Sequence, residues 1–152
     1  MARAPFNVLV FPYYPAGKNE FQYALLKRSD HGYWHAVAGG GEDDETPMDA
    51  AKRETNEETG ISMDSDFLRL DTVMPVPVTE YSVSYLWGEN VYVIPQYTFG
   101  VLVQNKRLLL SSEHTDYKWL DYEKAHKLVK YDGSKIALWE LNRKLRGLGP
   151  RD

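Results

Sequence analysis

The most constraining feature of this chain is a short stretch with strong signals for both ends of a helix. Thr46 is a favourable N-cap, Pro47 suits the first helical position, and Asp49 falls in the first turn, where an acidic group is stabilising. Gly60 is a typical residue at the end of a helix, because glycine tolerates a left-handed backbone. The pattern predicts a helix over residues 47–59.

Three glutamates crowd one side of this predicted helix. Each residue advances about 100° around a helix axis, so Glu54, Glu57 and Glu58 fall within an arc of about 100°. Two carboxylates about 4 Å apart repel by roughly 4 kcal/mol at an effective dielectric constant of 20. Either this is a solvated acidic face, where water screens the repulsion, or a divalent cation lies among the carboxylates.

The opposite side of the helix offers little apolar surface. Met48, Thr55 and Thr59 lie there and form a modest, partly polar face, so we expect neighbouring elements to hold the helix in place. The hard cations Mg²⁺ and Mn²⁺ prefer carboxylate oxygens and often bridge to substrate phosphates. Arg53 would then fix the position of a glutamate beside the ion.

Negative charge is concentrated around this helix. Residues 39–61 hold eight acidic residues against two basic ones, a local net charge of −6 in a chain whose total is −4. The rest of the chain therefore carries a net charge of +2. A net negative charge disfavours a nucleic-acid binder that relies on a broad basic surface, so no stable nucleic-acid partner is expected.

Strand and helix patterns follow one another along the rest of the chain. A turn is predicted at residues 15–19, and Pro75, Pro77 and Pro95 are expected at strand edges, bends or ends. Strands are predicted at residues 6–14, 20–29, 33–40, 67–78, 90–103 and 116–122, and further helices at 122–129 and 134–145. This order predicts an α/β fold, with a mixed sheet and helices on both of its faces.

Length and composition narrow the class of protein. The 152 residues fit a single domain over residues 1–152. The chain has no cysteine, which excludes disulfides and thiolate-bound zinc. No apolar run approaches the roughly 18–20 residues of a membrane span, and the N-terminal apolar run reads as a strand and not as a signal peptide. We expect a cytoplasmic protein without membrane contacts, and a homodimer is compatible with the sequence.

The acidic segment also matches a known motif. It contains Gly39, five residues, Glu45, seven residues, Arg53-Glu54, two residues, Glu57-Glu58, one residue and Gly60-Ile61. This spacing resembles the signature box of the Nudix hydrolases, G-x5-E-x7-R-E-U-x-E-E-x-G-U, in which U is a bulky aliphatic residue. All seven fixed letters and the final aliphatic residue are present, a match expected by chance on the order of once in several million such chains. The match favours the cation over the solvated face.

One position departs from the box. Thr55 stands where the motif has an aliphatic residue. Because this side chain points away from the carboxylates in the helical geometry, we expect it to lower stability without affecting chemistry.

The resemblance extends beyond the box. The segment "YWHAVAGGGEDDET" is similar to the strand and loop that lead into the box in many Nudix hydrolases. The segment "SSEHTDYKWLDYEKAHKL" resembles the one that follows the core sheet in dihydroneopterin triphosphate pyrophosphatases and in diadenosine tetraphosphate hydrolases. The first of these subgroups is the closer match over its full length.

Family membership would imply an α/β/α sandwich and a metal-dependent hydrolase that cleaves a diphosphate linkage by water attack. The resemblance assigns Mg²⁺, with Mn²⁺ as a substitute, to Glu54, Glu57 and Glu58, and makes Arg53 the residue that holds them. Glu45 would ligate a further ion or orient the helix, and Gly39 would position the loop next to the metal through its backbone. The family leaves the general base open between a glutamate of the box and a carboxylate on a distant loop, which here is Glu113. His114 beside it would be a structural or a substrate-side group.

Substrate recognition is less constrained by the sequence. Flat heterocycles bind by stacking, so Trp34, Tyr85, Trp87, Tyr97 and Phe99 are candidates, although each also suits the core. Lys27 and Arg28 on the second predicted strand would reach phosphates, or would simply face solvent at the rim of the sheet.

Three functions remain open at this stage, all with a small-molecule partner. The leading one is a pyrophosphohydrolase acting on a nucleoside triphosphate or on dihydroneopterin triphosphate, which releases pyrophosphate and a monophosphate. The second is a dinucleoside polyphosphate hydrolase, such as a diadenosine tetraphosphate hydrolase. The third is a non-catalytic Nudix-like domain that binds a nucleotide and regulates a partner, although such domains usually lose carboxylates of the box.

Overall fold

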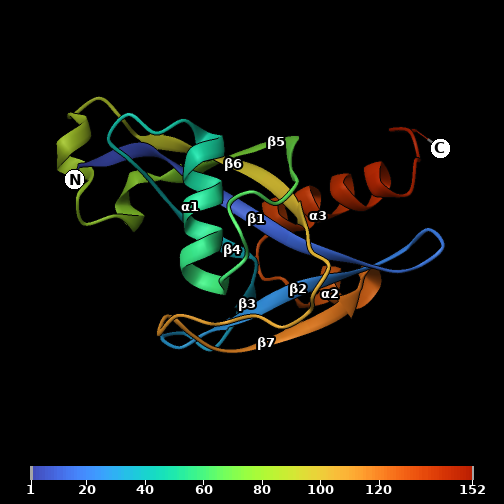
Figure 1. Cartoon of the computed structure of the whole chain (residues 1–152). Coiled ribbons are helices and arrows are strands. Elements are labelled where there is room, and N and C mark those ends of the chain that lie inside the picture. Colours follow the sequence, from blue (N-terminus) through green and yellow to red (C-terminus); the bar gives the residue numbers. More distant parts are fainter. Residues whose placement is uncertain (1, 152) are drawn as a thin grey trace.

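The computed structural model describes residues 2–151, so Met1 and Asp152, the ends of the predicted single domain, lie outside the described residues. The described chain forms a mixed sheet, three α-helices and two short 3₁₀ turns (Figure 1). The strands are β1 (Arg3–Gly17), β2 (Glu20–Arg28), β3 (Trp34–His35), β4 (Val37–Glu42), β5 (Phe67–Pro77), β6 (Val93–Leu102) and β7 (His114–Asp121). The helices are α1 (Pro47–Thr59), α2 (Tyr122–Leu128) and α3 (Asp132–Leu145), and the 3₁₀ turns are η1 (Val78–Glu80) and η2 (Ser84–Trp87).

The sheet is organised around β1. Its main path runs β3-β2-β1-β6-β5, while β4 pairs with β1 and β7 pairs with β2. The pairing of β1 with β6 is parallel and all the other pairings are antiparallel, so the expectation of a mixed sheet is confirmed.

Helices cover both faces of this sheet, as expected for an α/β/α sandwich. Alternate residues of β1 point to opposite faces. Val8 and Val10 belong to the core beneath α1, whereas Leu9 and Phe11 pack on the side of α2 and α3. Figure 1 shows α1 crossing one face of the sheet and α3 lying behind the other.

Helix α1 has the bounds that the sequence predicted. The Thr46 side chain accepts a hydrogen bond from the Asp49 N–H, the Asp49 side chain accepts one from the Thr46 N–H, and Gly60 ends the helix with φ of 77°. Two small side chains, Ala50 and Ala51, are fully buried against the sheet. The prediction of which face is buried was incomplete. It missed the alanines and also Glu58, which is as buried as the threonines opposite because the helix lies deep against β1 and β4.

The stretch predicted as one strand at residues 33–40 is instead two strands with different partners. β1 and β2 pair next to their turn and then diverge, and this stretch fills the gap between them. Its first part, β3, pairs with β2, and its second part, β4, pairs with β1. The local residue pattern cannot reveal this change of pairing partner, because both halves of the stretch are extended.

Two further boundaries differ from the expectation. The predicted five-residue turn at 15–19 is a tight turn at Lys18 and Asn19, because Asn19 adopts a left-handed backbone with φ of 55° and lets the strands extend. Pro75 and Pro95 lie opposite each other where β5 pairs with β6, and β5 is an edge strand, which fits the expected placement of proline.

The β5–β6 connection, residues 78–92, is only shallowly embedded in the fold. Neither of its 3₁₀ turns contains a buried residue, and Tyr85 and Tyr92 are 76% and 77% exposed. The Trp87 indole N–H donates a 2.8 Å hydrogen bond to the Arg3 carbonyl, which ties the connection to the start of β1. None of the helices within residues 2–151 has the length and apolar character needed to cross a bilayer.

Candidate functional site

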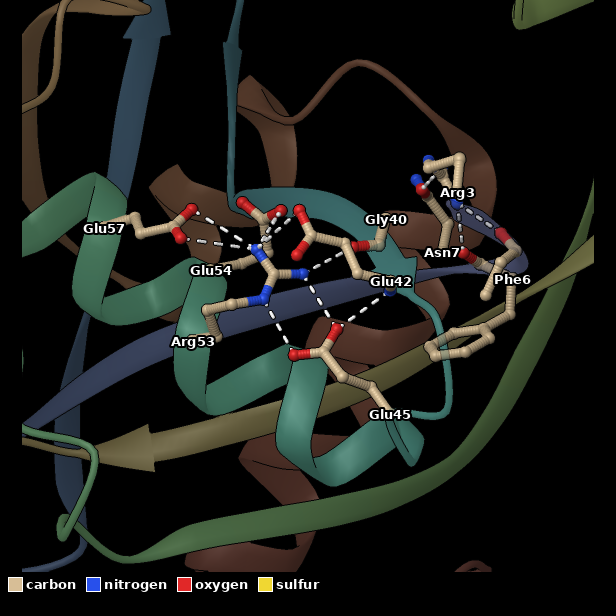
Figure 2. A network of polar contacts seen from close by, with 10 residues as sticks. Arg3, Phe6, Asn7, Gly40, Glu42, Glu45, Arg53, Glu54 and Glu57 are labelled. Atoms are coloured by element: carbon tan, nitrogen blue, oxygen red, sulfur yellow. Dashed lines mark hydrogen bonds and ion pairs between the residues drawn. The ribbon is translucent and has the colours of Figure 1, made fainter. Parts of the chain in front are cut away.

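Arg53 is the centre of a polar network at the start of α1 (Figure 2). Its Nε lies 2.8 Å from Glu45 Oε2, and its Nη1 lies 3.1 Å from Glu54 Oε1 and 3.3 Å from Glu57 Oε2. Its Nη2 donates a 2.8 Å hydrogen bond to the Gly40 carbonyl. One guanidinium therefore joins the helix, the loop before it and the end of β4, and these carboxylates raise the pKa of Arg53.

Both carboxylate oxygens of Glu45 are already engaged. Oε2 accepts from Arg53 Nε, while Oε1 accepts from Arg53 Nη2 at 3.0 Å and from the Glu42 N–H at 2.9 Å. The hydrogen bond from Arg53 lowers the pKa of Glu45 below its ordinary value. This geometry suits a residue that holds the loop against the helix.

Glu54 lies over the glycines of β4. A Cβ atom built on Gly39 would lie 2.1 Å from Glu54 Cδ, so any larger residue at Gly39 would displace this carboxylate. Burial raises the pKa of Glu54, and the charge of Arg53 partly opposes that shift. Glu54 is thus a largely buried carboxylate in an ion pair with Arg53.

Glu58 is buried and faces the carboxyl of Glu54, with which it can share a hydrogen bond only if one of the two carries a proton. The residue is 2% exposed, and neither Oε1 nor Oε2 has a hydrogen-bond partner within the described residues. Burial raises the pKa of Glu58 to about 9, and the charges of Glu54 and Glu113 add to the shift. An orphaned carboxylate is costly in a protein interior. A divalent cation with oxygen preference would satisfy it, so the donors here fit Mg²⁺ or Mn²⁺.

Glu57 is different again, because its side chain is 57% exposed and its ion pair is with Arg53. The three glutamates that share an arc of the helix therefore occupy three environments. As these side chains stand, no three His, Asp or Glu groups in residues 2–151 are close enough together to hold a metal ion.

Glu113 and His114 lie at the other side of the cluster. Glu113 is exposed, its carboxylate charge acts on both Glu54 and Glu58, and its carbonyl accepts a 2.9 Å hydrogen bond from the Ser29 N–H. His114 begins β7 and is buried, with Nδ1 3.6 Å from Glu58 Oε1. Of the two, only Glu113 is exposed to solvent.

The candidate substrate residues fall into separate groups. Lys27 and Trp34 are register partners at the edge between β2 and β3, and Trp34 is covered by Lys118 Nζ at 4.6 Å. Trp87 lies in the β5–β6 connection beside Tyr81.

Tyr97 forms an edge contact with Phe6 on the α1 face of the sheet. Phe99 is fully buried in the core, so it cannot stack on a substrate, and its selection as a candidate was wrong. Arg28 forms two 2.8 Å hydrogen bonds with Asp30, which raises the pKa of Arg28. Its charge also lowers the pKa of Glu58, so Arg28 lies towards the glutamates.

Sequence reasoning missed two residues next to the cluster. Arg3 packs against Gly40, between the rings of Tyr81 at 5.1 Å and Trp87 at 5.7 Å, and the charge of Glu54 acts on its pKa. His35 lies 3.3 Å from His114 through their Nε2 atoms. Arg3 precedes the first apolar run and His35 lies inside an ordinary strand pattern, so neither carried a local signal.

Two cavities lie elsewhere. One of about 490 Å³ is lined by residues 59–62 at the end of α1 and residues 102–105 after β6, among others. Another of about 350 Å³ lies beside Trp139 and Arg143 on α3. Neither of these two cavities is lined by Glu54, Glu57 or Glu58.

Comparison with known proteins places this geometry in context. A family model described as the NUDIX domain matches residues 5–139. The dihydroneopterin triphosphate diphosphatase of Escherichia coli is 30% identical over 138 residues, which cover 90% of this chain and 91% of that protein. The asymmetrical bis(5'-nucleosyl)-tetraphosphatase of Mus musculus is 27% identical over 121 residues, which cover 78% of this chain and 77% of that protein.

Solved structures agree on the architecture. A crystal structure described as a NUDIX hydrolase from Listeria monocytogenes superposes with a TM-score of 0.84 at 36% identity, covering 95% of this chain and 96% of that one. The E. coli dihydroneopterin triphosphate pyrophosphohydrolase superposes with a TM-score of 0.74 at 24% identity, covering 93% of this chain and 99% of that one. The second likeness supports the fold alone.

Proposed function

This chain belongs to the NUDIX family of hydrolases, and on that premise we propose that it is a Mg²⁺-dependent pyrophosphohydrolase that splits a triphosphate into a monophosphate and pyrophosphate. The proposed substrates are dihydroneopterin triphosphate and the nucleoside triphosphates. The single observation that carries the proposal is Glu58, a buried carboxyl that faces the carboxyl of Glu54 and receives no hydrogen bond from an N–H or hydroxyl group in the described residues. Such a group is stable in its ionised form only if a cation occupies the space in front of it.

The ligands that we propose for the cation are Glu54, Glu57 and Glu58. Glu58 contributes a carboxylate already stripped of water, while Glu57 contributes a mobile one from the solvent side. Glu54 would turn between Arg53 and the ion. When bound, the cation supplies neutralisation of the diphosphate oxygens and activation of the attacking water.

Arg53, Glu45 and Gly39 have a supporting role in this proposal. The paired Nε and Nη2 contacts from Arg53 to Glu45 fix the loop that precedes the helix. Gly39 leaves room for the Glu54 carboxylate directly against β4. Neither Glu45 nor Gly39 needs to touch the cation to matter, because each one limits where Glu54 can lie.

For the general base we propose Glu113. Within residues 2–151, its carboxylate takes part in no hydrogen bond or ion pair. The side chain is exposed to solvent and lies near Glu54 and Glu58. A base must reach the proton of the attacking water directly, and an exposed carboxylate at the rim is able to do so. A glutamate of the box remains the alternative base.

Two lines of support bear on the substrate. The diphosphatase relative matches nine tenths of both chains, which favours a triphosphate substrate with release of pyrophosphate. The tetraphosphatase relative matches about three quarters of both chains and favours a dinucleoside polyphosphate as the second candidate. The two reactions differ in their products, since the second would release a nucleotide that keeps more than one phosphate.

A substrate panel with product identification tests the proposal. The panel contains dihydroneopterin triphosphate, nucleoside triphosphates including oxidised ones, diadenosine tetraphosphate and ADP-ribose, each with Mg²⁺ and with Mn²⁺. Phosphorus NMR in ¹⁸O-labelled water would identify both products and the phosphorus atom that was attacked. Pyrophosphate from a triphosphate supports the proposal, ATP from diadenosine tetraphosphate supports the second candidate, and no hydrolysis at all would contradict both.

A further inference from the structure

Two buried histidines continue from Glu58 in a line of successive side-chain contacts. His114 Nδ1 lies 3.6 Å from Glu58 Oε1, and His114 Nε2 lies 3.3 Å from His35 Nε2. Glu58, His114 and His35 are 2%, 5% and 6% exposed. The three side chains come from α1, β7 and β3, so the line connects elements that are distant in the sequence.

Apart from the Glu54 carboxyl beside Glu58, the facing atoms of Glu58 and His114 have no hydrogen-bond partner in the described residues. His114 Nδ1 and both Glu58 oxygens lack hydrogen bonds within the described residues. Buried polar atoms are rarely left unpaired, because each one costs about 1–3 kcal/mol. The separation of 3.6 Å is slightly longer than a hydrogen bond, and a small rotation of either side chain closes it.

Chemistry fixes the direction of the hydrogen bonds once Glu58 is ionised. An ionised carboxylate only accepts, so His114 must carry its proton on Nδ1. A neutral imidazole has one N–H, which leaves His114 Nε2 as an acceptor, and His35 must then carry its proton on Nε2.

Both rings are set up to stay neutral. Burial lowers the pKa of His35 to about 3, and the neighbouring His114 adds to that shift. His114 is likewise buried, and burial disfavours the charged form of its ring.

We propose that His35 and His114 form a hydrogen-bonded pair that positions Glu58 as a cation ligand: His35 donates Nε2–H to His114, and His114 donates Nδ1–H to Glu58. The inference rests on the proposed function, because it takes Glu58 as a ligand. The donated hydrogen bond turns one oxygen of Glu58 inward and leaves the other oxygen to face the cation. His114 and His35 are positioning residues, since neither one touches the substrate.

The tautomers are directly measurable. Long-range ¹H–¹⁵N correlation spectra of the uniformly labelled protein with saturating Mg²⁺ distinguish protonated from bare ring nitrogens in each of the four histidines. The signals of His35 and His114 are assigned by their loss in single variants. We expect His114 to be protonated on Nδ1 and His35 on Nε2. A His114 protonated on Nε2 would overturn the inference.

Pairs of matched substitutions at each histidine test whether the ring acts through its hydrogen bond or only through its packing. The amide nitrogen of His114→Asn takes the place of Nδ1, whereas that of His114→Gln takes the place of Nε2. Calorimetric titration with MgCl₂ should find an affinity for the Asn variant close to that of the unaltered protein, and a loss of roughly 10- to 100-fold for the Gln variant.

The same comparison applies in reverse to the second histidine. His35→Gln keeps a donor at the Nε2 position and His35→Asn does not, so Gln should retain Mg²⁺ affinity better there. Melting temperatures of all four variants without metal report structural damage. Equal losses of affinity for Asn and Gln at both positions, in parallel with melting temperature, would reduce the pair to packing and overturn the inference.

The outcomes also distinguish this inference from the proposed function. An unaltered protein that binds no Mg²⁺ contradicts both. Binding of Mg²⁺ with the opposite tautomers contradicts only the histidine pair. Binding with the expected tautomers but without hydrolysis of any triphosphate or dinucleoside polyphosphate contradicts only the function.

Discussion

Helix α1 and the β5–β6 connection flank the same site but are built in opposite ways. Helix α1 is capped at both ends, has five buried residues and is held by a guanidinium with at least four partners. The β5–β6 connection has two single 3₁₀ turns without a buried residue, and it reaches the start of β1 through Trp87 and Arg3.

This contrast separates two tasks. Cation ligands must be held to a fraction of an ångström, and a rigid helix packed on a sheet provides that precision. A segment with few buried contacts opens at low free-energy cost, so it can adjust to the part of a substrate that differs between molecules. We therefore expect substitutions in α1 to lower turnover and substitutions in the connection to change substrate affinity.

The largest effect is expected for Glu58→Gln. Removing the buried charge should lower kcat at least about 1,000-fold, because the cation loses its most desolvated ligand. The metal-free variant should be more stable than the unaltered protein at pH 8, since the neutral amide does not titrate, whereas the buried Glu58 carboxyl costs free energy above pH 4.5. Steady-state kinetics and thermal unfolding measure the two quantities. Near-normal turnover would show that the helix does not perform the chemistry.

A smaller loss is expected for Glu57→Gln. Its side chain is 57% exposed, so it is worth less as a ligand than Glu58, and turnover should fall at least about 100-fold while the fold survives. Lys52→Gln, on the same helix, is a matched control that changes one charge outside the cluster. If Glu57→Gln behaves like this control, Glu57 is not part of the catalytic group.

Trp87→Phe tests the other side of the comparison. Phenylalanine keeps an aromatic ring near Arg3 but removes the indole N–H that holds the connection at 2.8 Å. We expect KM to rise by about 10-fold, equivalent to 1.4 kcal/mol, with kcat within a factor of about two. Tyr85→Phe, which changes a 76% exposed side chain in the same segment, is the control. A fall in kcat at constant KM would place the connection among the catalytic elements instead.

The buried carboxyl of Glu58 also makes stability without metal depend on pH. The folded state raises the pKa of Glu58 from 4.5 to about 9, so the folded chain keeps a proton that the unfolded chain loses. Its stabilising contribution is full below pH 4.5 and is lost as the pH rises towards 9.

His35 and His114 act below pH 6.5, because burial lowers both of their pKa values from 6.5. The window from pH 6.5 to 9 is therefore left mainly to the buried carboxyls of Glu58 and its neighbour Glu54, whose pKa values burial raises. In this pH window, the free energy of unfolding of the protein without metal should fall by up to about 1.4 kcal/mol per pH unit. Denaturant titrations measure it, and Glu58→Gln should flatten the slope. An equally steep slope in the variant would assign the effect to other groups.

The same contrast governs what the sequence could predict. The bounds of α1 follow from Thr46, Pro47 and Gly60, which act on their own neighbours, and the glutamate spacing is likewise local. Local signals also predicted the helices after β7 and the mixed sheet between two layers of helix. Where one short range of the chain decides the structure, the prediction was sound.

Contacts between distant residues were beyond such reasoning. The 3.3 Å approach of His35 to His114 joins residues 79 positions apart, and Trp87 reaches Arg3 across 84 positions. Periodicity also fails to distinguish three glutamates on one arc, although burial raises the pKa of Glu54 and of Glu58 while Glu57 is 57% exposed. The aromatic candidates show the same limit, since Phe99 is fully buried while Tyr85 is exposed.

The divergence of β1 and β2 limits which insertions and deletions the sequence can tolerate during evolution. His35, Val37 and Gly39 all face α1 from the stretch that fills the gap, so one end of it serves the histidine pair and the other serves Glu54. Inserting or deleting a single residue between them would turn one end to the opposite side of the sheet. The spacing between His35 and Gly39 is therefore as much a part of the site as the two residues themselves.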